Sequence, residues 1–298
     1  MSAAPTHTRR FVTRTAGGAR FADLARRCAD EDRGAFVPFL VIGDPSLDAF
    51  QDFADALVEA GADALELGLP FSDPPADGPV IQAADQRALA AGVTTASALD
   101  AVGALRARHD LPVSLLVYFN LVLQYGIDAF YARCAEVGVD AVLVADLPPE
   151  HAAPAVQAAR LHGIAAVFLA SELSPASRLG RIGEVCDGYV YSLARVGVTG
   201  ERVAVNAGLG AALERFATHL PLPLLVGFGI SSPEHVRAAL AAGADGVIVG
   251  SALVRRIAAH LDDPAQARAA LLTTARALRG ATQGLHALRT SPPDADPC

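Results

Sequence analysis

The sequence predicts an α/β protein made of a single (β/α)8 TIM barrel with an additional N-terminal helix. Three observations support this fold class. Short β-rich runs bounded by Gly, Pro or Asp alternate with longer stretches rich in Ala, Leu and Arg. Eight strand–helix pairs can be counted, which suits a closed parallel barrel better than an open doubly wound sheet. A short phrase also recurs ahead of every second strand, as expected for a barrel built from paired units.

The elements follow one another in the order that a barrel requires. We predict strands at about 35–42, 63–67, 112–118, 140–145, 164–169, 188–192, 222–226 and 246–249. Helices are predicted near 47–60, 79–91 with 94–108, 126–137, 149–162, 175–184, 203–219, 232–242 and 251–278, and a preceding helix at 20–31.

The recurring phrase places a glycine at the end of a helix and an aspartate at the start of a strand. It reads Glu59-Ala-Gly-Ala-Asp-Ala-Leu65 first and returns at 136–142 and 241–247, with a shorter version at 185–189. The glycine is typical of a helix C-terminus. We therefore expect structural roles at the bottom of the barrel for the four aspartates Asp63, Asp140, Asp187 and Asp245.

Composition excludes several classes of function. The chain has 298 residues, of which 52% are hydrophobic, and a formal net charge of −8, which argues against nucleic acid or an anionic membrane as the main partner. The four cysteines are far apart and the eight histidines are scattered, so we expect a reduced, cytoplasmic protein with no metal centre. No apolar run reaches the length of a membrane span.

The two ends of the chain differ from the middle. The first 20 residues carry four arginines with Ser and Thr and no acid. This composition is compatible with an organellar targeting segment, but the lack of an amphipathic pattern favours a disordered extension. We expect disorder over residues 1–19, the barrel over 20–280 and a flexible tail over 281–298.

Two acids near the second strand are candidates for proton transfer. Glu66 lies inside an apolar run, and Asp77 follows in a loop rich in proline and glycine. A carboxyl group in a buried strand is costly to desolvate, and a second acid nearby gives the pair that acid–base chemistry needs. The alternative is a strand-end acid bound by backbone amides and a turn aspartate.

Glycine clusters after the last strands predict an anion site. Barrel enzymes place their sites at the C-terminal ends of the strands. There, Gly227-Phe-Gly-Ile-Ser231 and Gly250-Ser251 offer backbone amides and a helix N-terminus to a phosphate, and Gly197-Val-Thr-Gly200 adds a third wall. The alternative is that these glycines only close tight turns.

Over about residues 34–278, the chain resembles the α subunit of tryptophan synthase. The resemblance rests on Phe39 through Gly43-Asp44-Pro45, on Glu66-Leu-Gly-Leu-Pro-Phe-Ser-Asp-Pro74 with Ala76-Asp-Gly-Pro79 and Ile81-Gln82, on Tyr118 and Asn120, on Ala145-Asp-Leu-Pro148 and on the three glycine clusters. The segment from Glu66 to Gln82 is the most specific part.

The resemblance implies a reaction and a set of roles. The expected reaction is the retro-aldol cleavage of indole-3-glycerol phosphate to indole and glyceraldehyde 3-phosphate, without a cofactor. Glu66 would be the proton shuttle, Asp77 would bind the ring N–H, and Tyr191 would lie beside both the glycerol and the glutamate. The remaining expected residues hold the phosphate (Gly200, Gly229, Gly250, Ser251), surround the indole or form the lid (Phe39, Leu116, Leu143, Thr199, Phe228), or face a β subunit in an αββα assembly (Pro70, Asp73, Pro74, Asn120).

Some residues depart from the family pattern and leave the partner open. Glu172 adds an acid after the fifth strand, Ala194 stands where serine is frequent, and Pro75 follows Pro74 where leucine is usual. A second proline stiffens the loop that carries Asp77. The alternatives to an ordinary α subunit are therefore a stand-alone lyase that releases free indole, and an inactive regulatory homologue that only binds β.

Overall fold

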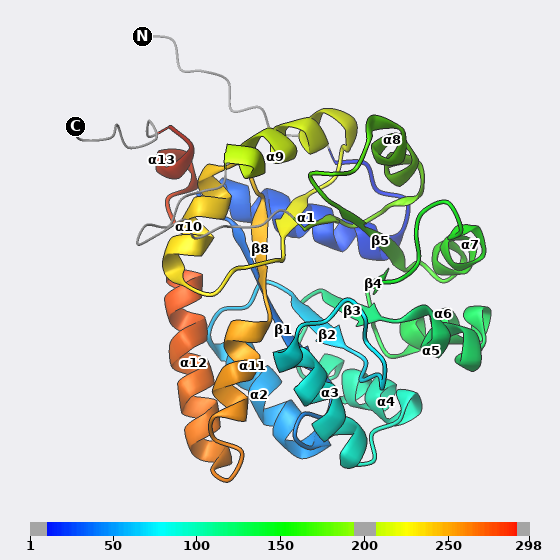
Figure 1. The fold of residues 1–298 in the computed structure, drawn as a ribbon, viewed down its shortest axis with the longest axis vertical. Helices are drawn as coiled ribbons and strands as arrows, with labels where there is room; N and C mark the ends of the chain where they lie inside the picture. Colours follow the sequence, from blue (N-terminus) through cyan, green and yellow to red (C-terminus); the bar gives the residue numbers. More distant parts are fainter. Residues whose placement is uncertain (1–10, 194–206, 291–298) are drawn as a thin grey trace.

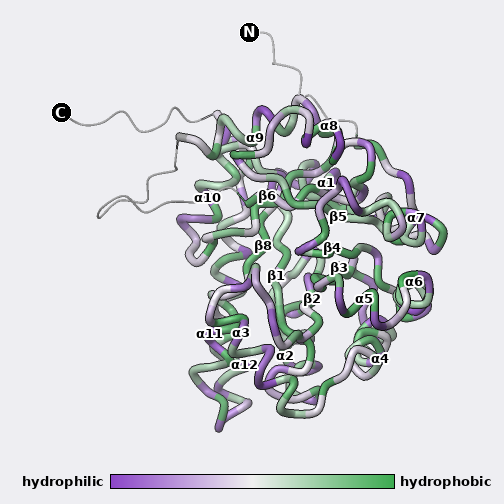
Figure 2. The backbone as a smooth tube through the Cα atoms, turned by 45° about the vertical axis from the view of Figure 1, so that its right-hand side comes forward, coloured by the Kyte–Doolittle hydropathy of each residue, from purple (hydrophilic) through white to green (hydrophobic). Residues whose placement is uncertain are grey.

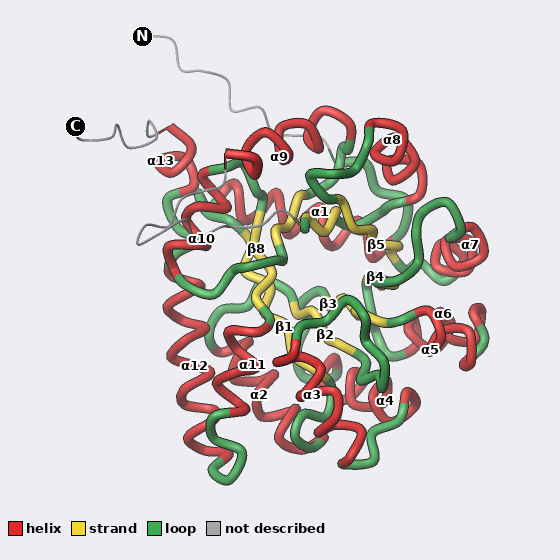
Figure 3. Tube along the Cα trace, viewed as in Figure 1, coloured by secondary structure: helices red, strands yellow, loops and turns green. Residues whose placement is uncertain are grey.

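Eight short parallel strands close into a barrel in the computed structural model, which describes residues 11–193 and 207–290 (Figure 1). The strands pair in sequence order from β1 to β8, and β8 pairs with β1. They are β1 Ala35–Val41, β2 Leu65–Gly68, β3 Val113–Val117, β4 Ala141–Val144, β5 Ala165–Ala170, β6 Val190–Ser192, β7 Leu224–Val226 and β8 Gly246–Val249. Helices surround the strands (Figure 3), and nearly every strand residue is buried. The predicted fold class is confirmed.

Helices surround the barrel and connect successive strands. They are α1 Ala16–Asp30, α2 Leu47–Glu59, α3 Pro79–Ala90, α4 Thr95–Arg106, α5 Phe119–Tyr125, α6 Ile127–Glu136, α7 Ala153–Leu161, α8 Ala176–Val185, α9 Ala207–His219, α10 Pro233–Ala241, α11 Ser251–Ala258, α12 Pro264–Gly280 and α13 Leu285–Thr290. Hydrophobic and hydrophilic residues alternate along the helices (Figure 2), and the buried residues of the helices are mostly hydrophobic. Among the described residues no single helix is long and apolar enough to cross a membrane, although α3 and α4, bent by 100°, pass that test as a pair on length and composition alone.

The single helix expected at 251–278 is wrong. Two helices, α11 and α12, occupy this range, and the chain turns between them. Asp263 caps α12 by accepting from the Gln266 amide, and Pro264 stands at the first helical position. Both residue types favour the start of a helix, so an Asp-Pro pair inside a helical pattern indicates that a second helix starts there. The short helix α5 was also not predicted.

The predicted boundaries of the two ends are corrected. The expected disordered extension reached residue 19, but α1 already begins at Ala16, and the Thr15 hydroxyl accepts from the Gly18 amide as its cap. The expected flexible tail began at 281, but Thr282 is buried and α13 packs on α10. Arg289 holds α13 by donating to the Ala244 carbonyl at 2.8 Å. Residues 1–10 and 291–298 lie outside the described part of the chain.

The four repeated aspartates have the structural role that the sequence predicts. Each one accepts a backbone N–H at the N-terminal end of the barrel, from Phe36, Val113, Arg14 and Leu224 for Asp63, Asp140, Asp187 and Asp245 respectively, at 2.9 to 3.1 Å. These carboxylates therefore join neighbouring segments at the closed end of the barrel. The opposite end, where the strands finish, is left for the site.

Candidate active site

Glu66 projects into the barrel from β2 and is 1% exposed. The strand register places it beside Phe39 of β1 and Ser114 of β3. The Tyr189 hydroxyl donates to Glu66 Oε1 at 3.0 Å, and it lies 2.9 Å from Ser114 Oγ. A chain of three polar side chains thus crosses an otherwise apolar interior.

The surroundings of Glu66 keep its carboxyl group protonated at neutral pH. Burial raises its pKa to about 8, because an apolar interior disfavours the charged form. The hydrogen bond from Tyr189 acts in the opposite direction, and the nearby charge of Asp77 raises the pKa further. A buried acid that still holds its proton at pH 7 is suited to general acid catalysis.

Asp77 lies in the loop between β2 and α3 and is held by Tyr118. The Tyr118 hydroxyl donates to Asp77 Oδ2 at 2.7 Å and accepts from the Ala76 amide at 3.2 Å. The side-chain Nε2 of Gln82 in α3 donates to the Asp77 carbonyl at 2.9 Å. Burial raises the pKa of Asp77, and the hydrogen bond from Tyr118 partly offsets this. Tyr118 therefore fixes one carboxylate oxygen of Asp77 and with it the orientation of the carboxyl group.

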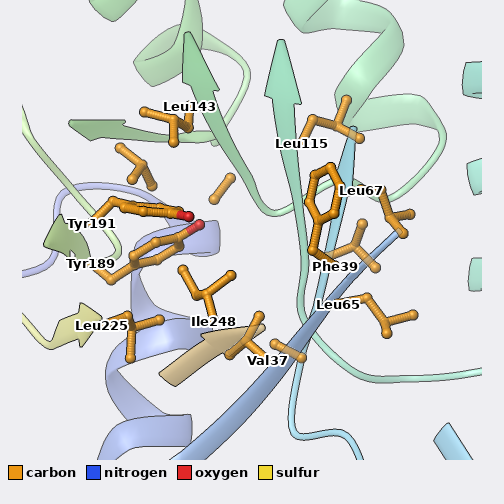
Figure 4. Packing of buried hydrophobic residues seen from close by; sticks show 14 of the residues in the cluster. Val37, Phe39, Leu65, Leu67, Leu115, Leu143, Tyr189, Tyr191, Leu225 and Ile248 are labelled. Carbon is orange, nitrogen blue, oxygen red and sulfur yellow. The ribbon is translucent and has the colours of Figure 1, made fainter. Parts of the chain in front are cut away.

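Tyr191 lies close to Glu66, since burial and then the glutamate charge raise its pKa, but it does not hydrogen-bond the glutamate. Its hydroxyl donates to the Gly227 carbonyl at 3.1 Å, whereas Tyr189 binds the glutamate. Both rings project into the barrel interior, one above the other, with Leu143 nearby (Figure 4). Sequence reasoning missed Tyr189 and Ser114. The two-residue spacing of Tyr189 and Tyr191 could have revealed the first, since alternate strand residues share one face.

The glycine clusters after β7 and β8 lie where an anion site is expected. Gly229 has a φ of 81°, which favours glycine, and Gly250 precedes the first residue of α11, Ser251. A side chain on Gly250 would come within 3.3 Å of the Phe39 ring, so the start of α11 lies against the residue that flanks Glu66. Thr199 and Gly200 lie outside the described residues.

None of the apolar residues predicted to surround a ring lines the cavity at the ends of the middle strands. A cavity of about 280 Å³ opens at the ends of β4, β5 and β6. It is lined by Val144, Ala145, Asp146, Leu147, Pro148, Pro149, Phe168, Leu169, Ser171, Ser174, Arg178 and Leu193, and so includes the family motif at 145–148. Phe39 and Leu143 are buried, and Leu116 is half-buried. Phe228 is 45% exposed. The Glu172 carbonyl accepts from Arg215 at 2.7 Å.

The residues predicted to face a partner divide into two groups. Asp73 and Asn120 are exposed, whereas Pro70 and Pro74 are buried. The two proline side chains therefore present little surface in this conformation.

Across the described ranges, 11–193 and 207–290, no group of three or more His, Cys, Asp or Glu side chains could hold a metal ion.

Comparison with known proteins decides the family. The sequence model described as "Tryptophan synthase alpha chain" matches residues 25–283. The chain belongs to the tryptophan synthase alpha chain family. A relative of that name from Klebsiella pneumoniae is 48% identical over 265 residues, which span 89% of this chain and 98% of the relative. One from Shewanella oneidensis is 46% identical over 264 residues, or 88% and 95% of the two chains.

Solved structures of the family share the barrel. Tryptophan synthase subunit alpha from Legionella pneumophila superposes with a TM-score of 0.81 at 34% identity, covering 88% of this chain and 98% of that one. The tryptophan synthase α2β2 complex from Pyrococcus furiosus contains a chain that superposes with a TM-score of 0.77 at 38% identity, covering 84% and 99%. The family resemblance predicted from the motifs is confirmed over the whole barrel.

Proposed function

We propose that this alpha chain cleaves indole-3-glycerol phosphate by a retro-aldol reaction to indole and glyceraldehyde 3-phosphate. The observation that carries the proposal is Glu66, an acid buried on the inner face of the barrel, where burial raises its pKa to about 8, with Asp77 on the adjoining loop. Family membership supports the same reaction.

The geometry accounts for each proton that the cleavage moves. Protonated Glu66 delivers its proton to C3 of the indole ring, which becomes cationic. Asp77 accepts the ring N–H and stabilises that charge with its carboxylate. The bond between C3 and the glycerol carbon then breaks and its electrons return to the ring. The glycerol hydroxyl loses its proton to the Glu66 carboxylate as the aldehyde forms, so Glu66 ends the cycle protonated.

Binding of the phosphate would use the loops after β7 and β8. The amides near Gly229 and those at the start of α11, with Ser251 first in that helix, suit a dianion because a helix N-terminus carries partial positive charge. Gly200 and Thr199 complete the proposed phosphate and lid residues. Phe39, Leu116, Leu143 and Phe228 remain the proposed contacts of the ring and lid.

We further propose a β subunit as the partner and the cytoplasm as the location. The Pyrococcus relative is described as an α2β2 complex, which supports the same assembly here. Asp73 and Asn120 are the exposed residues proposed to meet the partner. Three described cysteines, Cys28, Cys134 and Cys186, are buried free thiols, which supports a reducing compartment.

Indole release from indole-3-glycerol phosphate tests the function. Purified chain is assayed with and without a tryptophan synthase β subunit. Slow release that rises at least about tenfold with β supports the α-subunit role, since that change corresponds to about 1.4 kcal/mol, a typical size for coupling between two sites. Rapid release that β does not change would assign a stand-alone lyase. No release in either assay would refute catalysis and favour the regulatory alternative.

A further inference from the structure

Ser114 carries a buried hydroxyl that the reaction steps above do not use. It is the one polar residue of β3, which otherwise consists of valine and leucine, and it is 0% exposed. The strand register places it beside Glu66 of β2, so the two side chains lie on the same face of the sheet. A hydroxyl group in an apolar interior is costly unless it is hydrogen-bonded. Its partner here is the Tyr189 hydroxyl, 2.9 Å away.

Tyr189 itself is held in place on two further sides. Its ring packs on Phe21 of α1, with ring centroids 4.9 Å apart and planes at 48°. Its backbone carbonyl accepts from the Cys186 thiol at 3.2 Å. Because the ring and the backbone are held and the residue is 0% exposed, the main freedom left is the direction of the hydroxyl proton.

The direction of the hydrogen bonds follows from the count of protons. The Tyr189 hydroxyl has a single proton, which it donates to Glu66 Oε1 at 3.0 Å. Ser114 is therefore the donor in its own bond, and the Tyr189 oxygen accepts. Burial raises the pKa of Tyr189, and the hydrogen bond from Ser114 acts against this, as expected of a donor to the phenol oxygen. A hydroxyl that accepts one bond donates the next one more strongly.

We propose that Ser114 is a positioning residue for the cleavage: its hydroxyl donates to the Tyr189 oxygen, directs the Tyr189 proton to the Glu66 carboxyl group, and so favours delivery of the Glu66 proton to the substrate. This inference rests on the proposed function, because Glu66 is its point of action. Once Glu66 has given up its proton, it is an anion in an apolar interior. The bond from Tyr189 is then charge-assisted, so its alignment matters most at that stage.

Few other polar groups act on Glu66. Burial raises its pKa, the Tyr189 hydroxyl lowers it, and the charge of Asp77 on the loop after β2 raises it. The buried Tyr191 also lies close to the glutamate, but its hydroxyl binds the Gly227 carbonyl. The strands on either side of β2, which are β1 and β3, carry no titratable side chain. The bond from Tyr189, supported by Ser114, is therefore the contact that favours the ionised form of Glu66.

The pH dependence of kcat measures the effect, because the reaction starts from protonated Glu66 and its alkaline limb reports the ionisation of that acid. Indole release is assayed for the full-length wild type, Ser114→Ala, Tyr189→Phe and the double variant, in whichever form, alone or with β, gives the faster wild-type reaction. Thr282→Val is the matched control. It also removes a fully buried hydroxyl, one that donates to the Arg279 carbonyl near the start of β1.

Ser114→Ala is expected to move the alkaline limb to higher pH by about 0.3–1 unit, the shift that corresponds to the loss of one net hydrogen bond. At pH 7, kcat should fall by about two- to tenfold, because a less acidic Glu66 releases its proton less readily. In the Tyr189→Phe background, Ser114→Ala should move the limb no further, since Ser114 acts through the Tyr189 hydroxyl. Ser114→Cys places a weaker donor in a similar space and should move the limb in the same direction, which keeps the test decisive if the alanine variant does not fold.

An unmoved limb in Ser114→Ala and Ser114→Cys would overturn the proposal. An equal shift with and without the Tyr189 hydroxyl would overturn it too, because Ser114 would then act on Glu66 by another route. The same holds for an equal shift in Thr282→Val, which would trace the effect to the loss of any buried hydroxyl. Infrared titration of the Glu66 carboxyl band, with Glu66→Gln for subtraction, measures the same pKa difference without substrate. Failure of the proposed function is therefore distinguishable, because the wild-type chain would then release no indole while the titration still tests the contact.

Discussion

A carboxyl group such as Glu66 is tolerable in the centre of a barrel only because it can keep its proton. Its neutral form avoids the large cost of burying a charge, and the hydrogen bond from Tyr189 satisfies one of its oxygens. The burial that disfavours the ionised form of this acid also makes it a good proton donor at pH 7. Structure and chemistry therefore impose the same requirement on this position.

Glu66→Gln should abolish cleavage and leave the fold intact. Glutamine has the shape of the protonated acid and can accept from Tyr189, but it has no proton to exchange. We expect indole release to fall at least about 100-fold, the lower range for general acid–base catalysis. Near-normal turnover in the purified variant, with an unchanged melting temperature, would refute the proton-shuttle role.

Tyr189→Phe should move the alkaline limb of the pH–rate profile to higher pH. The Tyr189 hydroxyl favours the ionised form of Glu66, so its removal raises the pKa of the glutamate and keeps the acid protonated over a wider range. The profile of kcat against pH measures this. Tyr131→Phe, which removes the hydroxyl of another buried tyrosine, is the control; an equal shift in both variants would contradict the assignment.

At the scale of elements, the backbone at the end of β7 packs closely against a side chain of β6. A Cβ atom on Gly227 would lie 2.1 Å from the Tyr191 ring, and the Tyr191 hydroxyl binds the Gly227 carbonyl. The glycine therefore permits a close approach of backbone and ring. This contact joins the first glycine of the proposed phosphate loop to the barrel interior.

Gly227→Ala should displace Tyr191 or the end of β7. We expect a loss of about 1–3 kcal/mol in unfolding free energy, as for other overpacked cores, together with weaker substrate binding. Urea unfolding and KM measure the two effects. Gly210→Ala in α9, where no atom lies within 4 Å of the added carbon, should instead stabilise the protein by about 0.5–1 kcal/mol. Equal behaviour of the two variants would contradict the predicted overlap.

On the scale of the whole molecule, buried acids give stability an unusual pH dependence. Glu66 and Asp85 have pKa values of about 8 in the folded protein, well above their values of 4.5 and 3.8 in the open chain. Between these limits the folded state binds more protons than the unfolded state, so its stability falls as pH rises. The opposite slope, from carboxylates such as Glu31 whose pKa is lowered by Arg33, is confined to more acidic solutions.

The free energy of unfolding should therefore decrease from about pH 5 to pH 8 by about 2 kcal/mol or more. Urea titrations at a series of pH values measure the slope. Asp85→Asn should flatten it, because one of the two groups can no longer ionise. A stability that stays constant or rises over this range would contradict the raised pKa values of these two groups.

The sequence alone determined the fold class, the order of the elements and the family, because these depend on local patterns. Strand runs, helix-ending glycines and the four aspartates act over a few residues, and the segment from Glu66 to Gln82 is continuous. The structure confirmed the barrel, and the element boundaries differed mainly at caps such as Asp263-Pro264, where a local signal was overlooked. The site roles of Glu66 and Asp77 remain predictions that the geometry supports.

Only the tertiary structure decided which side chains meet. Tyr189 rather than Tyr191 donates the hydrogen bond to Glu66, although the two tyrosines are only two residues apart. Contacts across a barrel depend on the stagger of its strands, and Tyr189 and Glu66 are 123 residues apart in the chain. Asp85 reads as an ordinary helical acid in the sequence, and only the packing of α3 buries it. Burial and long-range register, which no local pattern encodes, select the partners of these groups.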